Sequence, residues 1–142
     1  MTNTEFIYQD PVNMEENLIL IEEWKSSLPN CGIFALVSEI DREHIPALQQ
    51  ICRQAQLPLI GAMFPELIYD SQFKNGGMIL IRIDNMPVHL LIENLSAPDQ
   101  NLDEIAERFT ASFEHKENST LFMIFDGMLP NISTFLDTLF RH

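Results

Sequence analysis

Three acidic side chains, Glu39, Glu66 and Asp126, each follow a short apolar run in this sequence. Carboxylates that meet in one crevice suit the recognition of an ammonium group, and they equally suit a hard divalent cation such as Mg²⁺. Glu39 and Asp126 also have a plainer role open to them, because acidic residues cap loops and favour helix N-termini. Binding, magnesium-dependent catalysis and simple capping all stay open at this point.

Glycine and apolar residues accompany the acids. At the carboxyl end of a strand, glycine lets the backbone turn or approach a ligand where a Cβ atom would obstruct it. Met63 and Phe64 directly follow such a glycine and would offer a ligand an apolar contact surface. We therefore predict a ligand-binding set of eight residues: Ser38, Glu39, Gly61, Met63, Phe64, Glu66, Asp126 and Gly127.

Other chemistries lack the residue patterns that they need. Cys31 begins an apolar run and Cys52 lies on the apolar stripe of a predicted helix, so we expect both to be structural. The sequence has no G-x-S-x-G elbow, no P-loop and no G-x-G-x-x-G fingerprint. Its four histidines form no H-x-x-x-H or Cys/His set. We therefore expect neither an enzyme nor a metal site.

The spacing of apolar residues predicts the elements that position these side chains. Asn13 and Glu16 match a capping box before a helix that Pro29 ends. Further helices are predicted at 45–55, at 131–140, and from Asn101 or Asp103 to Phe113. Short apolar runs predict strands at 31–37, 59–62, 78–83, 88–93 and 121–125. The fold class is α/β, with a mixed, mainly parallel sheet of about five strands and an antiparallel hairpin at 78–93.

This order of elements predicts one crevice. Strand–helix–strand connections make the first two strands parallel, and we expect the fifth strand to run the same way. Ligands of open α/β sheets bind outside the carboxyl ends of their strands. Residues 38–39, 61–66 and 126–127 should therefore meet at one edge of the sheet.

Length and charge limit the class of protein. The 142 residues suit one domain at 13–142 after an N-terminal arm at 1–12. A net charge of −13 argues against nucleic acid and anionic membranes as partners, and the eight Lys and Arg form no basic patch. No apolar run could span a bilayer and no signal peptide is apparent, so we expect a cytoplasmic protein.

Two segments carry a family resemblance. Residues 58–84 (PLIGAMFPELIYDSQFKNGGMILIRID) and 121–127 (LFMIFDG) resemble the FIST family, N-terminal sensory domains of bacterial signal-transduction proteins. In that family a strand ends in a Gly-Cys-Thr-x-Gly-Glu-like segment, another strand follows, and a later strand ends in Asp-Gly. Here Met63 and Phe64 stand where the family has small or hydroxylated residues, and Pro65 replaces its second glycine. These changes favour a narrower, more apolar pocket or one that binds nothing.

The resemblance implies a noncatalytic sensory domain that binds an amino-acid-like or other small ligand. Some FIST-type proteins bind haem, and His44 is then the candidate iron ligand. A protein interaction module with a vestigial pocket is the other alternative. The resemblance spans only about the first half of the family unit, so we expect either part of a longer protein or a stand-alone relative. In the second case a homodimer or a downstream signalling partner would complete the sheet, with 78–83 as its exposed edge.

Overall fold

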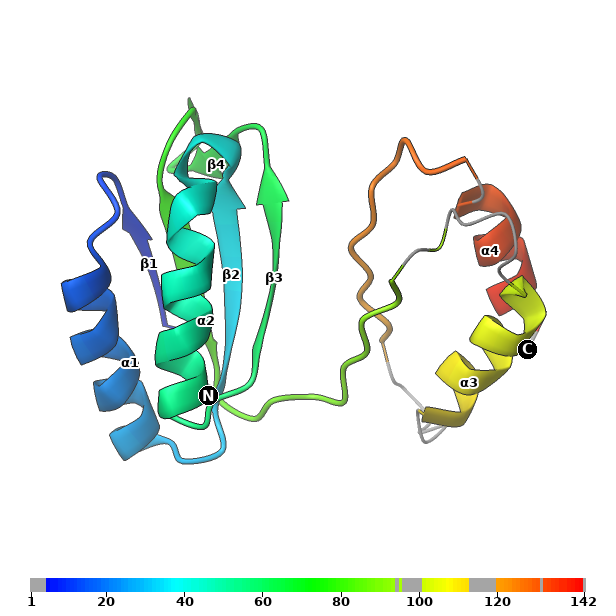
Figure 1. Ribbon diagram of the computed structural model, residues 1–142, viewed down its shortest axis with the longest axis horizontal. Coiled ribbons are helices and arrows are strands. Elements are labelled where there is room, and N and C mark those ends of the chain that lie inside the picture. Colours follow the sequence, from blue (N-terminus) through cyan, green and yellow to red (C-terminus); the bar gives the residue numbers. More distant parts are fainter. Residues whose placement is uncertain (1–4, 94, 96–100, 113–119, 131, 142) are drawn as a thin grey trace. The chain divides into compact units, whose positions relative to one another are not determined.

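The computed structural model describes residues 5–93, 95, 101–112, 120–130 and 132–141, and it divides the chain into two compact units (Figure 1). The first unit ends at Pro87 and the second begins at Val88. Among the described residues, no helix is long and apolar enough to cross a bilayer.

A four-stranded sheet forms the centre of the first unit, in the order β1-β6-β2-β3. The strands are β1 (Phe6–Gln9), β2 (Gly32–Ser38), β3 (Leu59–Phe64) and β6 (Met78–Ile83). β2 pairs with β3 in parallel, whereas β6 is antiparallel to both β1 and β2. The α/β class and the mixed sheet are thus confirmed, but the sheet has four strands and only one parallel pair of neighbours.

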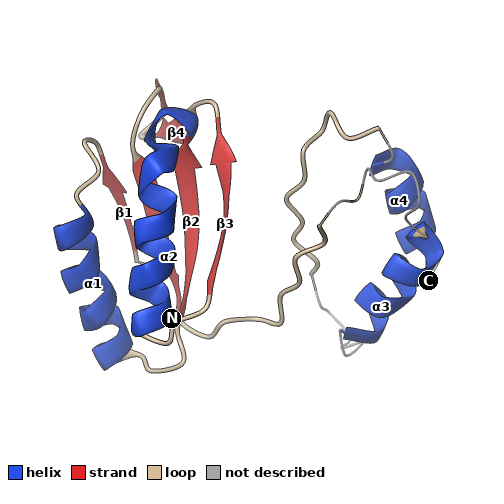
Figure 2. Cartoon of the chain, viewed as in Figure 1, coloured by secondary structure: helices blue, strands red, loops and turns tan. Residues whose placement is uncertain are grey.

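Two helices, α1 (Met14–Ser27) and α2 (Ile45–Gln54), cover one face of this sheet (Figure 2). The backbone N–H groups of Glu15 and Glu16 donate to Asn13 Oδ1 over 3.1 and 3.3 Å, so the predicted N-cap is confirmed. Pro46 lies in the first turn of α2, where its missing N–H leaves no bond unmade. A 3₁₀ helix, η1 (Glu39–His44), connects β2 to α2.

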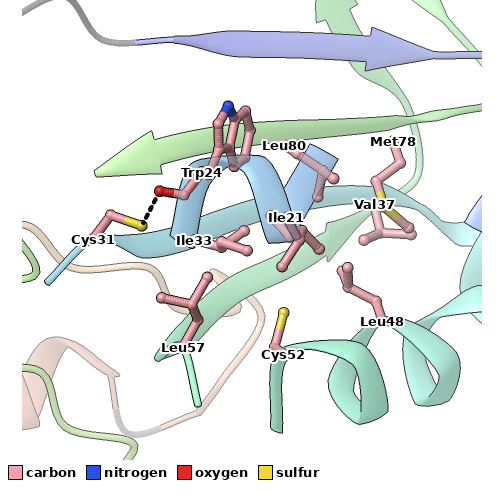
Figure 3. Packing of buried hydrophobic residues seen from close by; sticks show 11 residues of the cluster. Ile21, Trp24, Cys31, Ile33, Val37, Leu48, Cys52, Leu57, Met78 and Leu80 are labelled. Carbon is pink, nitrogen blue, oxygen red and sulfur yellow. Dashed lines mark hydrogen bonds between the residues drawn. The ribbon is translucent and has the colours of Figure 1, made fainter. Parts of the chain in front are cut away.

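The core lies between these helices and the sheet (Figure 3). Alternate residues of β2 and β6 face the helices, among them Ile33 and Leu80, which are 0 % and 1 % exposed. α1 buries one polar side chain beside an exposed apolar one. Leu18 is 37 % exposed, whereas the neighbouring Asn17 is fully buried. The buried apolar residues that α1 and α2 contribute to the core are Ile21, Trp24, Leu48 and Cys52.

β1 is an element that the sequence did not reveal, because residues 1–12 read as an arm. Its register places Phe6 opposite Ile81 and Tyr8 opposite Ile79. β6 is therefore an interior strand between β1 and β2, and the expectation that 78–83 forms an exposed edge is wrong. The edges of the sheet are β1 and β3. As an edge strand, β3 keeps several half-exposed side chains.

The antiparallel hairpin lies elsewhere than predicted. Residues 88–93 form no strand, and both sides of β6 are already paired with β1 and β2. The observed hairpin joins β4 (Leu67–Tyr69) to β5 (Gln72–Lys74). Its two central residues, Asp70 and Ser71, have φ of 50° and 60°, the left-handed pair of a type I′ turn. The backbone twist of a type I′ turn matches the right-handed twist of the two strands that it connects.

The second unit contains α3 (Leu102–Ser112) and α4 (Ile132–Leu139), which pack against each other. Asn101 Oδ1 accepts from the N–H of Glu104 over 3.3 Å, which confirms Asn101 rather than Asp103 as the helix start. Phe113, the predicted end of this helix, lies outside the described residues. Residues 121–125 form no strand, so the expected fifth strand is wrong: in the described part of this unit no strand is present to pair with it.

Candidate functional site

The carboxyl ends of β2 and β3 lie side by side, as the sequence predicted. Ser38, the last residue of β2, is in register with Phe64, the last residue of β3. The segments that follow, beginning with Glu39 and Pro65, therefore start at the same end of the sheet. Asp126 and Gly127 belong to the second compact unit.

The hydroxyl group of Ser38 makes a structural hydrogen bond and is not accessible to a ligand. Ser38 is fully buried, and its Oγ donates to Asp41 Oδ2 over 3.1 Å. The same carboxylate oxygen accepts from the backbone N–H of Gly77 over 2.6 Å, and Gly77 O accepts from Ser38 N over 3.0 Å. These bonds fasten the end of β2 to the start of β6. Asp41 was not predicted from the sequence. The only local signal for its role is its position three residues after Ser38.

Gly77 has a conformational reason to be glycine. Its φ is +101°, and a Cβ atom built there would lie 2.6 Å from Gln9 O. The preceding carbonyl, Gly76 O, is 3.0 Å from Tyr8 Oη, which also lies 3.2 Å from Asp10 Oδ2. Burial and then the negative charge of Asp10 raise the pKa of Tyr8, so its hydroxyl stays a donor at neutral pH. Gly76 and Gly77 thus shape the backbone that leads into β6.

Ser38, Asp41 and His44 do not form a catalytic triad. In such a triad histidine stands between the nucleophile and the acid, so that it can take the hydroxyl proton. Here the acid stands in the middle: Asp41 Oδ1 is 3.9 Å from His44 Nε2, while Oδ2 accepts from Ser38. No base reaches Ser38 from this group, and the serine is inaccessible.

The remaining predicted residues of the first unit are spread along the end and edge of the sheet. Glu39 and Glu66 are exposed, and Met63 on β3 is 46 % exposed. Gly61 serves strand packing, because a Cβ atom there would lie 2.1 Å from Ala35 O of β2. Within the described ranges, no group of three or more His, Cys, Asp or Glu residues could hold a metal ion.

Asp126 and Gly127 form a local turn. The backbone N–H of Met128 donates to Asp126 Oδ1 over 2.9 Å, and Leu129 N donates to Asp126 O over 3.1 Å. An aspartate that accepts from the residue two positions ahead makes an Asx turn. Asp126 thus has the capping role that the sequence left open, and a Cβ atom at Gly127 would meet nothing within 4 Å.

We call the face of the sheet opposite α1 and α2 the open face. A groove of about 470 Å³ lies on this face. The register explains its floor, because Leu36 pairs with Ile79 and Phe6 with Ile81, and paired residues point to the same side. The hairpin of β4 and β5 supplies the remaining lining residues. The lining residues are Phe6, Leu36, Ile68, Tyr69, Asp70, Ile79 and Ile81.

Aromatic contacts attach the hairpin to this face. The ring of Tyr69 stacks on Tyr8 with centroids 4.7 Å apart, and Phe6 meets Tyr69 edge-on at 6.4 Å. Leu67, two residues earlier, is only 3 % exposed. Asp70 follows at the turn and is the only ionisable side chain besides Tyr69 in the lining. None of the eight predicted binding residues lines the groove.

The groove can hold a molecule, and neither cysteine lies in its lining. Its floor is apolar, and its single carboxylate could meet an ammonium or amide group. Both cysteines lie in the core on the other side of the sheet. Burial raises the pKa of the Cys31 thiol, and it raises the pKa of Cys52 to about 11, so both stay protonated at neutral pH.

Comparisons of the chain with protein-family models, with curated proteins and with solved structures found no match. The FIST resemblance therefore stays a prediction.

Proposed function

We propose that the first unit is a noncatalytic small-molecule-binding domain, of the kind that serves as the sensory part of a signalling protein. Its ligand would lie in the open-face groove. The single observation that carries the proposal is the composition of that groove: an apolar floor from three strands with one carboxylate, Asp70, at its side. Ligand pockets of proteins commonly combine such a lining with a few polar groups and have volumes of about 300–1,000 Å³.

The chemistry favours a small amine or amino acid with an apolar side chain. Contact with the groove floor would remove apolar surface of both molecules from water, and one fully buried aliphatic or aromatic side chain contributes roughly 1.5–3 kcal/mol. Asp70 would orient the ammonium group. Because Asp70 is exposed, solvent screens this ion pair, and apolar contact should contribute the larger share of the affinity.

The groove is preferred to the ends of β2 and β3 because of what the residues there already do. Ser38 is buried and donates to Asp41, and Gly61 is glycine because a Cβ atom would clash with the β2 backbone. The groove and the strand ends are close in sequence, because the hairpin directly follows residues 61–66.

A thermal-shift screen of amino acids and related amines tests the proposal. A ligand at a hundredfold excess over its Kd stabilises the folded state by about 2.7 kcal/mol, which raises Tm by several degrees. We expect Asp70→Asn to weaken the amines selectively, and Phe6→Ala to weaken both the amines and their uncharged analogues. Glu66→Gln is the matched control, because it removes one exposed carboxylate at the strand ends.

The control also tells the two locations apart. If Glu66→Gln abolishes the response and Asp70→Asn leaves it intact, the ligand lies at the strand ends and the groove is the wrong site. If no compound in a broad screen raises Tm, the domain is not a small-molecule sensor.

An interaction module is the second candidate, favoured by one apolar pair on the hairpin. Ile68 and Phe73 are in register and are 66 % and 73 % exposed. Exposed apolar side chains side by side are typical of protein contact surfaces. For this function, amines should give no thermal shift, and Phe73→Ser should weaken the binding of a signalling partner while leaving Tm nearly unchanged.

A further inference from the structure

β3 is an edge strand whose own residues lack the features that keep edges apart. Its six residues, LIGAMF, include no charge and no proline, and no strand of the described residues pairs with its outer side. Edge strands normally carry charges or prolines, or are very short, because their unpaired N–H and C=O groups invite another strand. The opposite edge, β1, has only four residues and is flanked by Glu5 and Asp10. β3 is longer, and its prolines, Pro58 and Pro65, lie outside the strand.

The hydrogen-bond pattern tells which groups of β3 point outward. The N–H of Ile33 donates to Pro58 O over 2.9 Å, so Pro58 directs its carbonyl group toward β2. Successive residues of a strand direct their backbone groups to opposite sides. Ile60, Ala62 and Phe64 therefore also face β2, whereas Leu59, Gly61 and Met63 direct N–H and C=O away from the sheet.

We propose that β3 pairs with the β3 strand of a second copy of this chain. The pairing is antiparallel about a twofold axis at Gly61, so that Gly61 meets its own counterpart and Leu59 meets Met63 of the second copy. Such a contact is self-complementary, as a twofold axis requires. It joins two four-stranded sheets into one continuous sheet, and it does not depend on the ligand proposed above.

Charge at the two ends of β3 favours this antiparallel arrangement with a second copy. Arg53 lies exposed in the last turn of α2, at the end of the helix from which the chain enters β3. Glu66 lies exposed just beyond the carboxyl end of β3. Antiparallel pairing brings the amino end of one β3 beside the carboxyl end of the other. Each Arg53 then lies at the same end of the seam as Glu66 of the second copy, and the seam itself is uncharged.

The expected dimer is weak. The seam consists of one strand and the side chains beside it, chiefly Met63, which is 46 % exposed. Interfaces smaller than the standard size of about 1,600 Å² characterise transient association. We expect a dissociation constant in the micromolar range, and a stronger dimer at low salt, because the Arg53–Glu66 attraction is screened by ions.

Sedimentation velocity of the whole chain over a range of concentrations tests the seam. Met63→Pro removes an outward N–H without touching the bonds to β2, and proline is tolerated on an edge strand in this orientation. It should weaken the dimer at least about tenfold. Met63→Ala is the matched control, because it shortens the same side chain and keeps the N–H. It should weaken the dimer much less.

A charge swap gives a second test that does not alter β3. Glu66→Arg should weaken the dimer, and Arg53→Glu combined with Glu66→Arg should restore it. Circular dichroism checks that each variant is folded, and the swap decides the matter if Met63→Pro does not fold. A wild-type chain that stays monomeric throughout the micromolar range overturns the proposal. So does a dimer that neither Met63→Pro nor the swap affects, since its contact then lies elsewhere, for example on the open face.

Discussion

The two faces of the central sheet are made of similar side chains but end up in different surroundings. On the helix-covered face, Ile33 and Leu80 are almost completely buried. On the open face, Phe6 is 56 % exposed, and the hairpin above it leaves a groove of about 470 Å³. The difference teaches that the apolar character of a strand does not by itself decide whether it builds core or binding surface.

The reason lies in what is available to cover each face. β2 (GIFALVS) is apolar on both sides, a pattern that is typical of strands covered twice. α1 and α2 together span one side, whereas β4 and β5 have three residues each. Burial on the open side is therefore incomplete, and the remaining apolar area is what a ligand or a protein partner could remove from water.

Matched leucines give the largest test of this comparison. Leu80→Ala on the helix-covered face should lower the free energy of unfolding by about 2–5 kcal/mol, because the side chain is 1 % exposed and leaves a cavity. Leu36→Ala on the open face, where the side chain is only partly buried, should cost about 1–2 kcal/mol. Urea unfolding monitored by circular dichroism measures both. Equal losses would contradict the distinction between the faces.

The pH dependence of stability reports on the helix-covered face through Cys52. Burial raises the pKa of its thiol from 9.0 to about 11. Below pH 9 the thiol is protonated in both states and its contribution is fully present. Between about pH 9 and 11 only the unfolded chain loses the proton, so the free energy of unfolding falls by about 1.4 kcal/mol per pH unit. This component should disappear in Cys52→Ala, and equal slopes for the two proteins would show that the thiol is not buried.

Asn17 is a weak point in the otherwise apolar covering of that face. It is 0 % exposed, and among the described residues its Oδ1 has no hydrogen-bond partner. Its Nδ2 lies 3.8 and 4.0 Å from two methionine sulfurs. Asn17→Leu should therefore raise the free energy of unfolding by about 1–2 kcal/mol. Asn13→Ala, in the same helix, should lower it by about 1 kcal/mol through loss of the N-cap. Destabilisation by Asn17→Leu would mean that this asparagine is needed where it stands.

The smallest effect concerns the hairpin that partly covers the open face. Ser71 has φ of 60°, a conformation in which glycine is free of the Cβ clash. Ser71→Gly should raise the free energy of unfolding by about 0.5 kcal/mol, measured as a small rise in Tm. The same substitution at exposed Ser26 of α1 should lower it by a similar amount, because glycine weakens a helix. A fall in Tm for Ser71→Gly would argue against the type I′ turn.

Elements with local signals were predictable from the sequence. Asn13 begins α1 and Pro46 opens α2, and both depend on neighbours within one helical turn. The runs at 88–93 and 121–125 look just as apolar, yet neither forms a strand. A strand needs a partner with a free edge, and the short β1 already occupies the side of β6 that the predicted hairpin would have used.

The candidate site shows the same division. The sequence drew attention to strand ends, and the adjacency of Ser38 and Phe64 confirms that two of them meet. The groove instead combines Phe6, Leu36, Asp70 and Ile81, which lie far apart in the chain and carry no shared motif. Only strand order and register make them neighbours.

Taken alone, the amino-acid sequence determined the α/β class, the starts of α1 and α2 and the strands β2, β3 and β6, because capping and side-chain periodicity act over a few residues. The tertiary structure decided that β6 is interior, that β3 is an edge and that one apolar face stays open. Those outcomes depend on which distant segments compete for the same backbone hydrogen bonds and the same apolar surface, and that competition is settled only when the whole unit packs together.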